Sequence, residues 1–282
     1  MKIRNAIATF SAACLTAALL TSSVSAMSAV GNVNVPYGTP KVDGKISSGE
    51  YASAATVNFS SKTAKAWSGS IAEGFNADVK FLWDENGLYF AGDILDSAVT
   101  ASSEGKYDGD AFQITIDMGQ YFATTEESRA IFYSFGLNET KAMIQRQESK
   151  NNAVMYDGDG VAIKTWKTDN GWAFEAMIEW DTLEEDANLK SGKTFEAKEG
   201  FKLNAMFCYM DKDASNKLIS AFGTTLTGED VAYDWGPKDH GITLTLAAKK
   251  AAPANAAQTA DPIALLLVAA SGSALVVAKR RK

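Results

Sequence analysis

Aromatic residues in turns are the side chains of this sequence that are best suited to contact a ligand. Trp235 lies between Asp234 and Gly236, where an indole has little core to join. Aromatic rings offer a large, flat apolar surface on which a ligand can stack. Amides and carboxylates beside the ring can then bind the polar groups of that ligand. Trp235 is therefore a candidate for contact with a ligand. Trp67, in a Ser- and Gly-rich segment, is either an exposed platform or a plug beneath a loop.

Neighbouring carboxylates are a second group with possible chemistry, since Ca²⁺ prefers oxygen ligands. Three pairs lie at close spacing: Asp157 with Asp159, Asp211 with Asp213, and Asp43 with Glu50. None of them is followed by the remaining residues of an EF-hand loop. We expect each pair to close a solvated turn, so no metal ligand is assigned from the sequence.

Catalytic motifs are not found in the sequence. His240 is the only histidine, so we expect neither a Ser-His triad nor a multi-histidine zinc site. Its place at the entrance of a strand also disfavours the Met and His ligand pair of a haem iron. A glycosidase needs two opposed carboxylates, but no motif marks a nucleophile or an acid. Cys208 is the one cysteine outside the N-terminal apolar stretch, and its apolar neighbours indicate a buried thiol. We therefore expect a protein that is not an enzyme.

The elements that must position these residues are strands. Hydrophobic residues alternate with period two at 79–83, 172–179 and 203–207, which predicts strands with one buried face. Turns rich in Asp, Asn and Gly separate such runs at short intervals. Only residues 181–189 favour a helix of one or two turns. We expect an all-β fold, an antiparallel β-sandwich, with one domain at 36–247 because no linker interrupts that range.

Three further tryptophans fall within strand patterns, at positions 83, 172 and 180. For Trp83, Trp172 and Trp180 we expect packing in the core.

The N-terminal end of the sequence predicts export. Lys2 and Arg4 precede an apolar stretch at 6–20, and small residues close it at Ala26. This layout is typical of a signal peptide at 1–26 that is cleaved after Ala26.

The C-terminal end predicts retention at the cell surface. Residues 248–260 have the composition of a flexible spacer, and residues 261–282 carry an apolar stretch followed by four basic residues. This layout resembles the sorting signal that sortases read in Gram-positive bacteria, with Gln258, Thr259 and Ala260 at the cleavage position. The alternative is a permanent membrane tail. Both place the domain outside the cell, held at the cell wall or membrane.

Five blocks of the sequence resemble carbohydrate-binding module family 9. They lie in the family's order at 37–51, 77–89, 107–117, 171–180 and 241–244. Asp96 falls where the family has an Asp after its second strand. The resemblance implies a DOMON-like jelly-roll sandwich, a non-catalytic role in binding sugar, and structural Ca²⁺ in some members.

The same resemblance implies a pair of aromatic residues that clamp the sugar. Tyr107 takes the first position, just before the strand that begins at Asp110. Tyr233 or Trp235 takes the second, and the spacing does not choose between them. The accompanying polar candidates are Asp110 and Gln113, although a carboxylate at the start of a strand often closes a turn.

The polar contacts depart from the family pattern. Gln113 stands where the family has a Glu, and the Arg and Asn of the following strand fall near Tyr133 and Phe135. The sugar preference of the family is therefore not carried over.

The chain has a formal net charge of -7, and its two ends hold several of its basic residues. The acidic middle repels nucleic acid and anionic lipid and suits a neutral ligand. We expect a secreted, surface-anchored, non-catalytic protein that binds a polysaccharide or oligosaccharide. The alternatives are a structural surface protein or adhesin that binds another protein, and a glycoside-hydrolase-associated or haem-binding DOMON-like domain.

Overall fold

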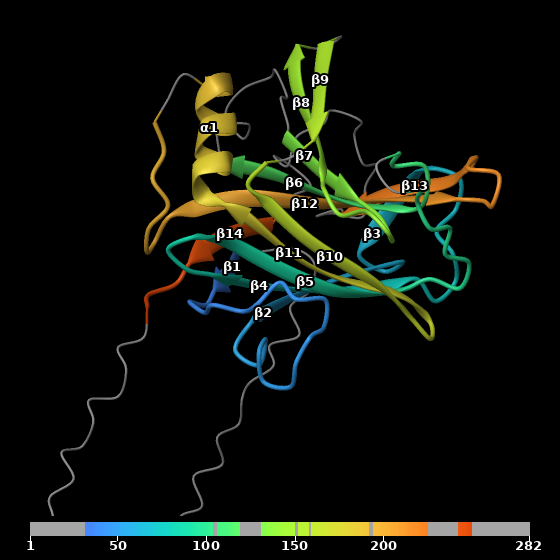
Figure 1. Cartoon of the computed structure of the whole chain (residues 1–282), viewed down its shortest axis with the longest axis horizontal. Coiled ribbons are helices and arrows are strands. Elements are labelled where there is room, and N and C mark those ends of the chain that lie inside the picture. The colour runs from blue at the N-terminus through green and yellow to red at the C-terminus, as the bar shows by residue number, and fades with distance from the viewer. Residues whose placement is uncertain are drawn as a thin grey trace, which may run out of the picture.

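Two β-sheets packed face to face form the architecture seen in the computed structural model (Figure 1). The structure describes residues 32–103, 106–118, 131–149, 152–157, 159–191, 194–224 and 242–249. The predicted signal peptide, most of the spacer and the C-terminal tail lie outside these residues. So do Tyr233, Trp235 and His240.

One sheet has five strands, and all of its neighbouring pairs are antiparallel. Its order is β10 (Val161–Thr168), β11 (Gly171–Glu179), β5 (Gly87–Leu95), β4 (Asn76–Trp83) and β2 (Ala55–Ser60). The turn between β4 and β5 is closed by Asp84, whose Oδ1 accepts hydrogen bonds from the N–H groups of Asn86 and Gly87.

The other sheet has nine strands. Its main order is β1 (Asn32–Val35), β14 (Ile242–Leu246), β12 (Lys202–Lys212), β6 (Ala111–Met118), β7 (Ile131–Phe135), β8 (Met143–Ser149) and β9 (Asn152–Asp157). The first half of β12 pairs with β14, and its second half pairs on the same side with β13 (Leu218–Thr224). In turn, β13 pairs with β3 (Ala64–Ser68). The pair of β1 and β14 is parallel.

The core lies between the two sheets because each strand turns alternate side chains inward. Phe112 of β6 lies 4.9 Å from Phe174 of β11, and Phe81 of β4 stacks on Phe207 of β12 at 5.9 Å between ring centroids. Trp172 is fully buried in the same cluster. The prediction of an all-β sandwich is confirmed.

One helix, α1 (Trp180–Ser191), follows β11 directly. Asp181 in its first turn is favourable beside the N-terminus of a helix. The helix predicted at 181–189 is confirmed, whereas Trp180 begins the helix and does not continue the strand. Trp180, Trp83 and Trp172 are all buried, as expected. Among the described residues, no helix has the length and apolar character needed to cross a membrane.

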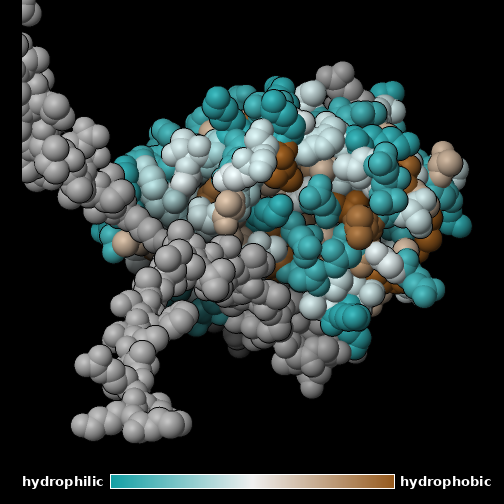
Figure 2. All heavy atoms as spheres, turned by 90° about the horizontal axis from the view of Figure 1, so that it is seen from below, coloured by the Kyte–Doolittle hydropathy of each residue, from teal (hydrophilic) through white to brown (hydrophobic). Residues whose placement is uncertain are grey.

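The segment at 38–54 covers the outer face of the five-stranded sheet. Its Tyr51 packs in a small buried cluster with Leu82 and Tyr89. On the face seen from below, hydrophobic residues form small separate spots among mostly hydrophilic ones (Figure 2).

The first and last described strands meet at one end of the sandwich. The indole N–H of Trp83 donates to the carbonyl of Ala247 at 3.0 Å, and the N–H of Ala247 donates to Val35. Outside this end, Lys249 contacts Glu85 at 2.6 Å. The strand ends at Leu95, Gly171 and Lys212 lie at the opposite end, away from the two exits of the chain (Figure 1).

Candidate functional site

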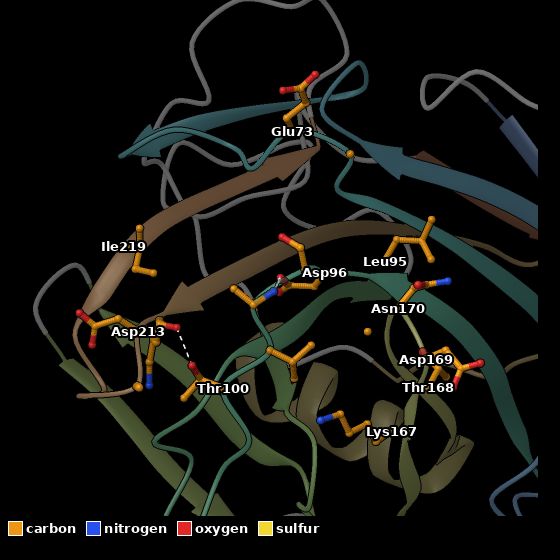
Figure 3. Close-up of a pocket in the computed structure, with 17 residues that line it drawn as sticks. Glu73, Leu95, Asp96, Thr100, Lys167, Thr168, Asp169, Asn170, Asp213 and Ile219 are labelled. Carbon is orange, nitrogen blue, oxygen red and sulfur yellow. Dashed lines mark hydrogen bonds between the residues drawn. The ribbon is translucent and has the colours of Figure 1, made fainter.

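A hollow of about 900 Å³ lies at the end of the sandwich opposite the two chain exits (Figure 3). Its walls are Glu73, Gly74, Ile219 and the segments 95–100, 167–171 and 212–214. Leu95 and Ile219 give it exposed apolar surface, and lysines and carboxylates surround them. None of these wall residues is aromatic, so the hollow by itself offers no ring on which a sugar could stack.

A tight turn between β10 and β11 forms one wall. The carbonyl of Asn170 accepts a hydrogen bond from the N–H of Asp96 at 3.0 Å. Gly171 follows with a φ of 156°, and a Cβ at this position would lie 1.9 Å from the carbonyl oxygen of Ile94. Only glycine allows this close approach of the two backbones.

Asp110 closes the loop that leads from β5 to β6. Its two carboxylate oxygens accept from the backbone N–H groups of Thr100 and Lys212, both at 2.7 Å. The hydroxyl of Thr100 donates to the carbonyl of Lys212 at 2.8 Å. Because Asp110 is fully buried, we infer that it holds the loop to the end of β12 and does not contact a ligand from solution.

Asp110 also belongs to a cluster of three buried carboxylates. One oxygen from each of Asp96, Asp110 and Asp211 lies within 4.8 Å of the others. The exposed fractions of these side chains are 8%, 0% and 8%. Burial raises the pKa of Asp110 to about 7 against the lowering effect of its backbone hydrogen bonds, and the charges of Asp96 and Asp211 add to the increase. Burial also raises the pKa of Asp211, again with a contribution from Asp96.

The hydrogen bonds to this cluster leave one oxygen without a partner. The donors to Asp96 are the N–H of Ala98 and the hydroxyl of Tyr209, and the donor to Asp211 is the hydroxyl of Ser220. Asp211 Oδ1 is buried and accepts no hydrogen bond. Within the part of the chain that the structure describes, no lysine or arginine forms an ion pair with the cluster.

Tyr107 lies on the same loop in an unusual backbone conformation. Its φ is 51°, in the left-handed region that few non-glycine residues adopt. Its N–H donates to Glu139 Oε1 at 2.9 Å, and its carbonyl accepts from Lys212 Nζ at 3.2 Å. These contacts place the half-buried Tyr107 in one network with Asp110 and Lys212.

Gln113 lies on the opposite side of β6 from Asp110. Positions 110, 112 and 114 point toward the core, so Gln113 points to the outer face of the nine-stranded sheet. Its amide donates to the hydroxyl of Ser134 at 2.7 Å, and both side chains are largely buried. Asp110 and Gln113, which the sequence placed in one ligand site, therefore do not share a face.

The register of β7 changes which residues stand beside Gln113. Gln113 pairs with Ser134, whereas Tyr133 and Phe135 are buried on the core side. The polar residue of β7 on the same face of the sheet as Gln113 is Ser134. Tyr133 and Phe135, near which the sequence places the family's Arg and Asn, therefore lie on the other face of β7 from Gln113.

Of the remaining candidates from the sequence, some lie outside the described residues and one lies in a strand. Tyr233 and Trp235 lie outside the described residues, and so does the side chain of Asp157. Trp67 lies in β3, and not in a loop, beside Gly223 of β13.

Hydrogen bonds and neighbours show the roles of Glu50, Asp211 and Asp213, which belong to two of the three carboxylate pairs. Glu50 closes a turn by accepting from Ser47, and Asp213 accepts from the N–H groups of Ser215 and Lys217. Asp211 joins Asp96 and Asp110, so it has a different role from its neighbour Asp213.

A family model and two solved structures both relate this chain to carbohydrate-binding family 9. Residues 42–225 match the model of a family described as carbohydrate family 9 binding domain-like. Two solved structures of a carbohydrate binding module family 9 from Caldicellulosiruptor kristjanssonii, one in complex with cellotriose and one with glucose, superpose with a TM-score of 0.53 at 19% identity. Each covers 79% of this chain, and 99% and 100% of the respective neighbours are covered. At this identity the likeness shows the fold.

A curated relative is the exoglucanase XynX of Acetivibrio thermocellus. It is 26% identical over 149 residues, which is 52% of this chain and 12% of the relative. The chain thus spans only a small part of that protein's length.

Proposed function

We propose, because the chain belongs to the carbohydrate family 9 binding domain-like family, that it is a secreted, surface-anchored protein that binds a carbohydrate without cleaving it. The observation that carries this proposal is the family match over most of the domain. The net charge of -7 favours a neutral ligand over an anionic one. The two solved neighbours bind cellotriose and glucose, so we propose a neutral gluco-oligosaccharide as the ligand.

We assign the contact with the sugar to the Tyr107 end of β6 and β7. The ring of Tyr107 provides the stacking surface, and the amide of Gln113 with the hydroxyl of Ser134 provides the polar contacts. Tyr233 or Trp235 supplies the second ring of the clamp. Asp110 acts as a positioning residue, because its carboxylate is occupied by the backbone of Thr100 and Lys212.

The two ends of the sequence support the proposed location. The signal peptide at 1–26 directs export, and the tail at 261–282 retains the domain at the cell wall or membrane of a Gram-positive bacterium. Transpeptidation by a sortase after Thr259 is the first form of attachment that this layout fits. A permanent membrane tail is the alternative, and mass spectrometry of the surface-released protein distinguishes the two.

The test is titration of the purified full-length protein with cellotriose and glucose, followed by calorimetry and tryptophan emission. We expect Tyr107→Ala to weaken binding at least tenfold, or about 1.4 kcal/mol. Tyr37→Ala, at the opposite end of the sandwich, is the matched control and should bind like the parent.

Each other outcome identifies a different function. Absence of any response to glycans would leave the adhesin as the better interpretation. Release of shorter sugars from cellotriose would instead show an enzyme. Loss of binding in Lys167→Ala with full binding in Tyr107→Ala would move the site into the hollow.

A further inference from the structure

Trp166 is an indole that belongs neither to the core nor to the proposed sugar clamp. It lies in β10, an edge strand of the five-stranded sheet, and its side chain is half-buried. Val161 and Ile163 of the same strand are buried in the core, so positions 161, 163 and 165 point inward. Because successive side chains of a strand point to opposite faces, Trp166 lies on the outer face of this sheet.

The indole N–H of Trp166 differs from those of the buried tryptophans. Trp83, Trp172 and Trp180 each donate this N–H to a protein oxygen at 2.7–3.1 Å. Among the residues that the structure describes, Trp166 makes no such hydrogen bond and contacts no other aromatic ring. An indole N–H that serves a buried structural role usually has a partner in the protein. The N–H of Trp166 can therefore donate to a ligand at the surface.

The strand register places small and acidic side chains in one row with Trp166. Across the sheet, this row runs through Trp166, Ala173 of β11, Asp93 of β5 and Asp78 of β4. Paired residues point to the same face, and neighbouring strands lie about 4.8 Å apart. Ala173 contributes only a methyl group, whereas Asp93 and Asp78 are exposed. A sugar ring that stacks on Trp166 can therefore extend toward Asp93, two strands away.

The segment at 38–54 forms a wall beside this row. It is fixed to the sheet by Glu175, which accepts from the N–H of Gly44 at 2.9 Å. Glu175 pairs with Lys164, and a Cβ on Gly44 would lie 3.8 Å from that of Lys164. Lys164 is on the same face as Trp166, two residues before it. The indole thus lies next to the part of the face that the segment covers.

The composition of the row favours a neutral carbohydrate as its occupant. Apolar surface comes from Trp166 and from Leu95, which is 42% exposed and follows Asp93 by two residues on the same face. The carboxylates beside them repel the phosphates of a nucleic acid, and charged groups are depleted at the centre of protein interfaces. Asn58 donates to Asp78 Oδ1 at 2.7 Å and leaves Oδ2 for a hydroxyl group. A flat ring with carboxylate acceptors at its side matches the C–H face and the hydroxyls of a sugar.

We propose that Trp166 is the platform of a second carbohydrate site, on the outer face of the five-stranded sheet, where Asp93 and Asp78 accept hydrogen bonds from a neutral glycan. The site assigned to Tyr107 and Gln113 lies on the nine-stranded sheet. The second site therefore goes beyond the proposed function, from which it takes only the class of ligand.

Two sites on opposite sheets give the domain a property that one site lacks. A short oligosaccharide cannot reach both, because the two packed sheets lie between them. Two segments of a polysaccharide can be bound at once, and the second binding event then occurs at a high effective concentration. The domain is thus suited to cross-link polysaccharide chains, or to hold one long chain at two points.

The test is calorimetric titration of the full-length protein with cellotriose. We expect two molecules of cellotriose per chain in the parent. Trp166→Leu keeps the apolar volume but removes the flat ring, so it should leave one site. Tyr107→Ala should leave the other, and the double variant should leave none.

A carboxylate beside the ring is tested in the Tyr107→Ala background, where only the second site remains. Asp93→Ala should weaken the remaining binding of cellotriose at least fivefold. Asp169→Ala is the matched control, because it removes the same charge from an exposed turn outside the row. Equal affinity in the Asp93→Ala and Asp169→Ala proteins would contradict the role of Asp93.

The outcomes separate this proposal from the first one. A single site that is lost in Tyr107→Ala and kept in Trp166→Leu would overturn the second site and leave the proposed function standing. A single site with the reverse pattern would support the Trp166 site and overturn the assignment of Tyr107. Absence of binding to the parent would overturn both.

Hydroxyl-radical footprinting of the parent decides the matter if Trp166→Leu fails to fold. Saturating cellotriose should slow the oxidation of Trp166 at least twofold. An unchanged rate at Trp166 in a protein that binds cellotriose would overturn the second site.

Discussion

Buried carboxylates in two parts of the described structure have different surroundings. Glu175, on the outer face of β11, is a single carboxylate whose Oε2 accepts from the N–H groups of Asp43, Gly44 and Lys45 at 2.9–3.2 Å. The cluster at the open end brings together three carboxylates within 4.8 Å of one another. In both places one buried oxygen, Glu175 Oε1 or Asp211 Oδ1, accepts no hydrogen bond.

The difference shows what backbone donors can and cannot do. Three N–H groups in one turn can surround one carboxylate, much as such turns bind anions. Three carboxylates within 4.8 Å repel one another regardless of how many N–H groups each receives. The first arrangement anchors a segment of chain, whereas in the second, burial and the neighbouring carboxylates raise the pKa of Asp110 and Asp211.

The largest effect is expected from Glu175→Ala. Its loss leaves the three N–H groups at 43–45 without an acceptor and detaches the segment whose Tyr51 packs against Tyr89. We expect a destabilisation of about 3 kcal/mol in urea unfolding. Glu175→Gln keeps an oxygen acceptor and should lose less than about 1 kcal/mol. Equal losses in the two variants would show that the charge, and not the acceptor, anchors the segment.

A smaller effect is expected from Tyr209→Phe at the cluster. The hydroxyl of Tyr209 donates to Asp96 at 2.8 Å and accepts from the indole N–H of Trp172 at 3.1 Å. Removing it leaves a buried indole N–H unpaired, so we expect a loss of about 2 kcal/mol. Thermal unfolding of the variant and the parent measures this loss. Equal stability of the two would mean that the hydrogen bonds linking Trp172, Tyr209 and Asp96 do not stabilise the cluster.

The pH dependence of Glu175 gives a finer comparison. Burial raises the pKa of Glu175, against the lowering effect of its backbone hydrogen bonds. A carboxyl with a raised pKa in the folded state stabilises the fold at low pH, and this contribution is lost as the pH rises through the folded-state value. Relative to Glu175→Gln, the parent should lose stability on going from about pH 4 to neutral pH. A parallel pair of stability curves would contradict this sign.

The smallest effect concerns a buried group that stays neutral. Burial raises the pKa of Cys208 to about 12, so its thiol remains protonated at neutral pH. We expect no reaction with a thiol reagent in the native protein and full reaction in urea. Rapid labelling of the native protein would show that the outer face of β12 opens readily.

Much of the fold could be predicted from the sequence because its signals are local. Alternation and Asp-, Asn- and Gly-rich turns predicted the strands, and the single helical stretch was found near 181–189. Core positions of Trp83 and Trp172 also followed from period two. The parity of a strand likewise puts Asp110 on the inward face with Phe112, a local signal against contact with a ligand from solution.

The candidate site depended on relations that no local pattern contains. Asp211 is far from Asp96 and Asp110 in the sequence, and the three meet because β5 ends, β6 begins and β12 ends at the same end of the sandwich. The pairing of Gln113 with Ser134 depends on the register of β6 and β7, and a shift of one residue exchanges the two faces. The sequence by itself determined the strands, the family and the candidate residues, since these rest on side-chain period and composition. Only the tertiary structure decided which carboxylates share a site, because burial and strand register bring distant residues within a few ångströms.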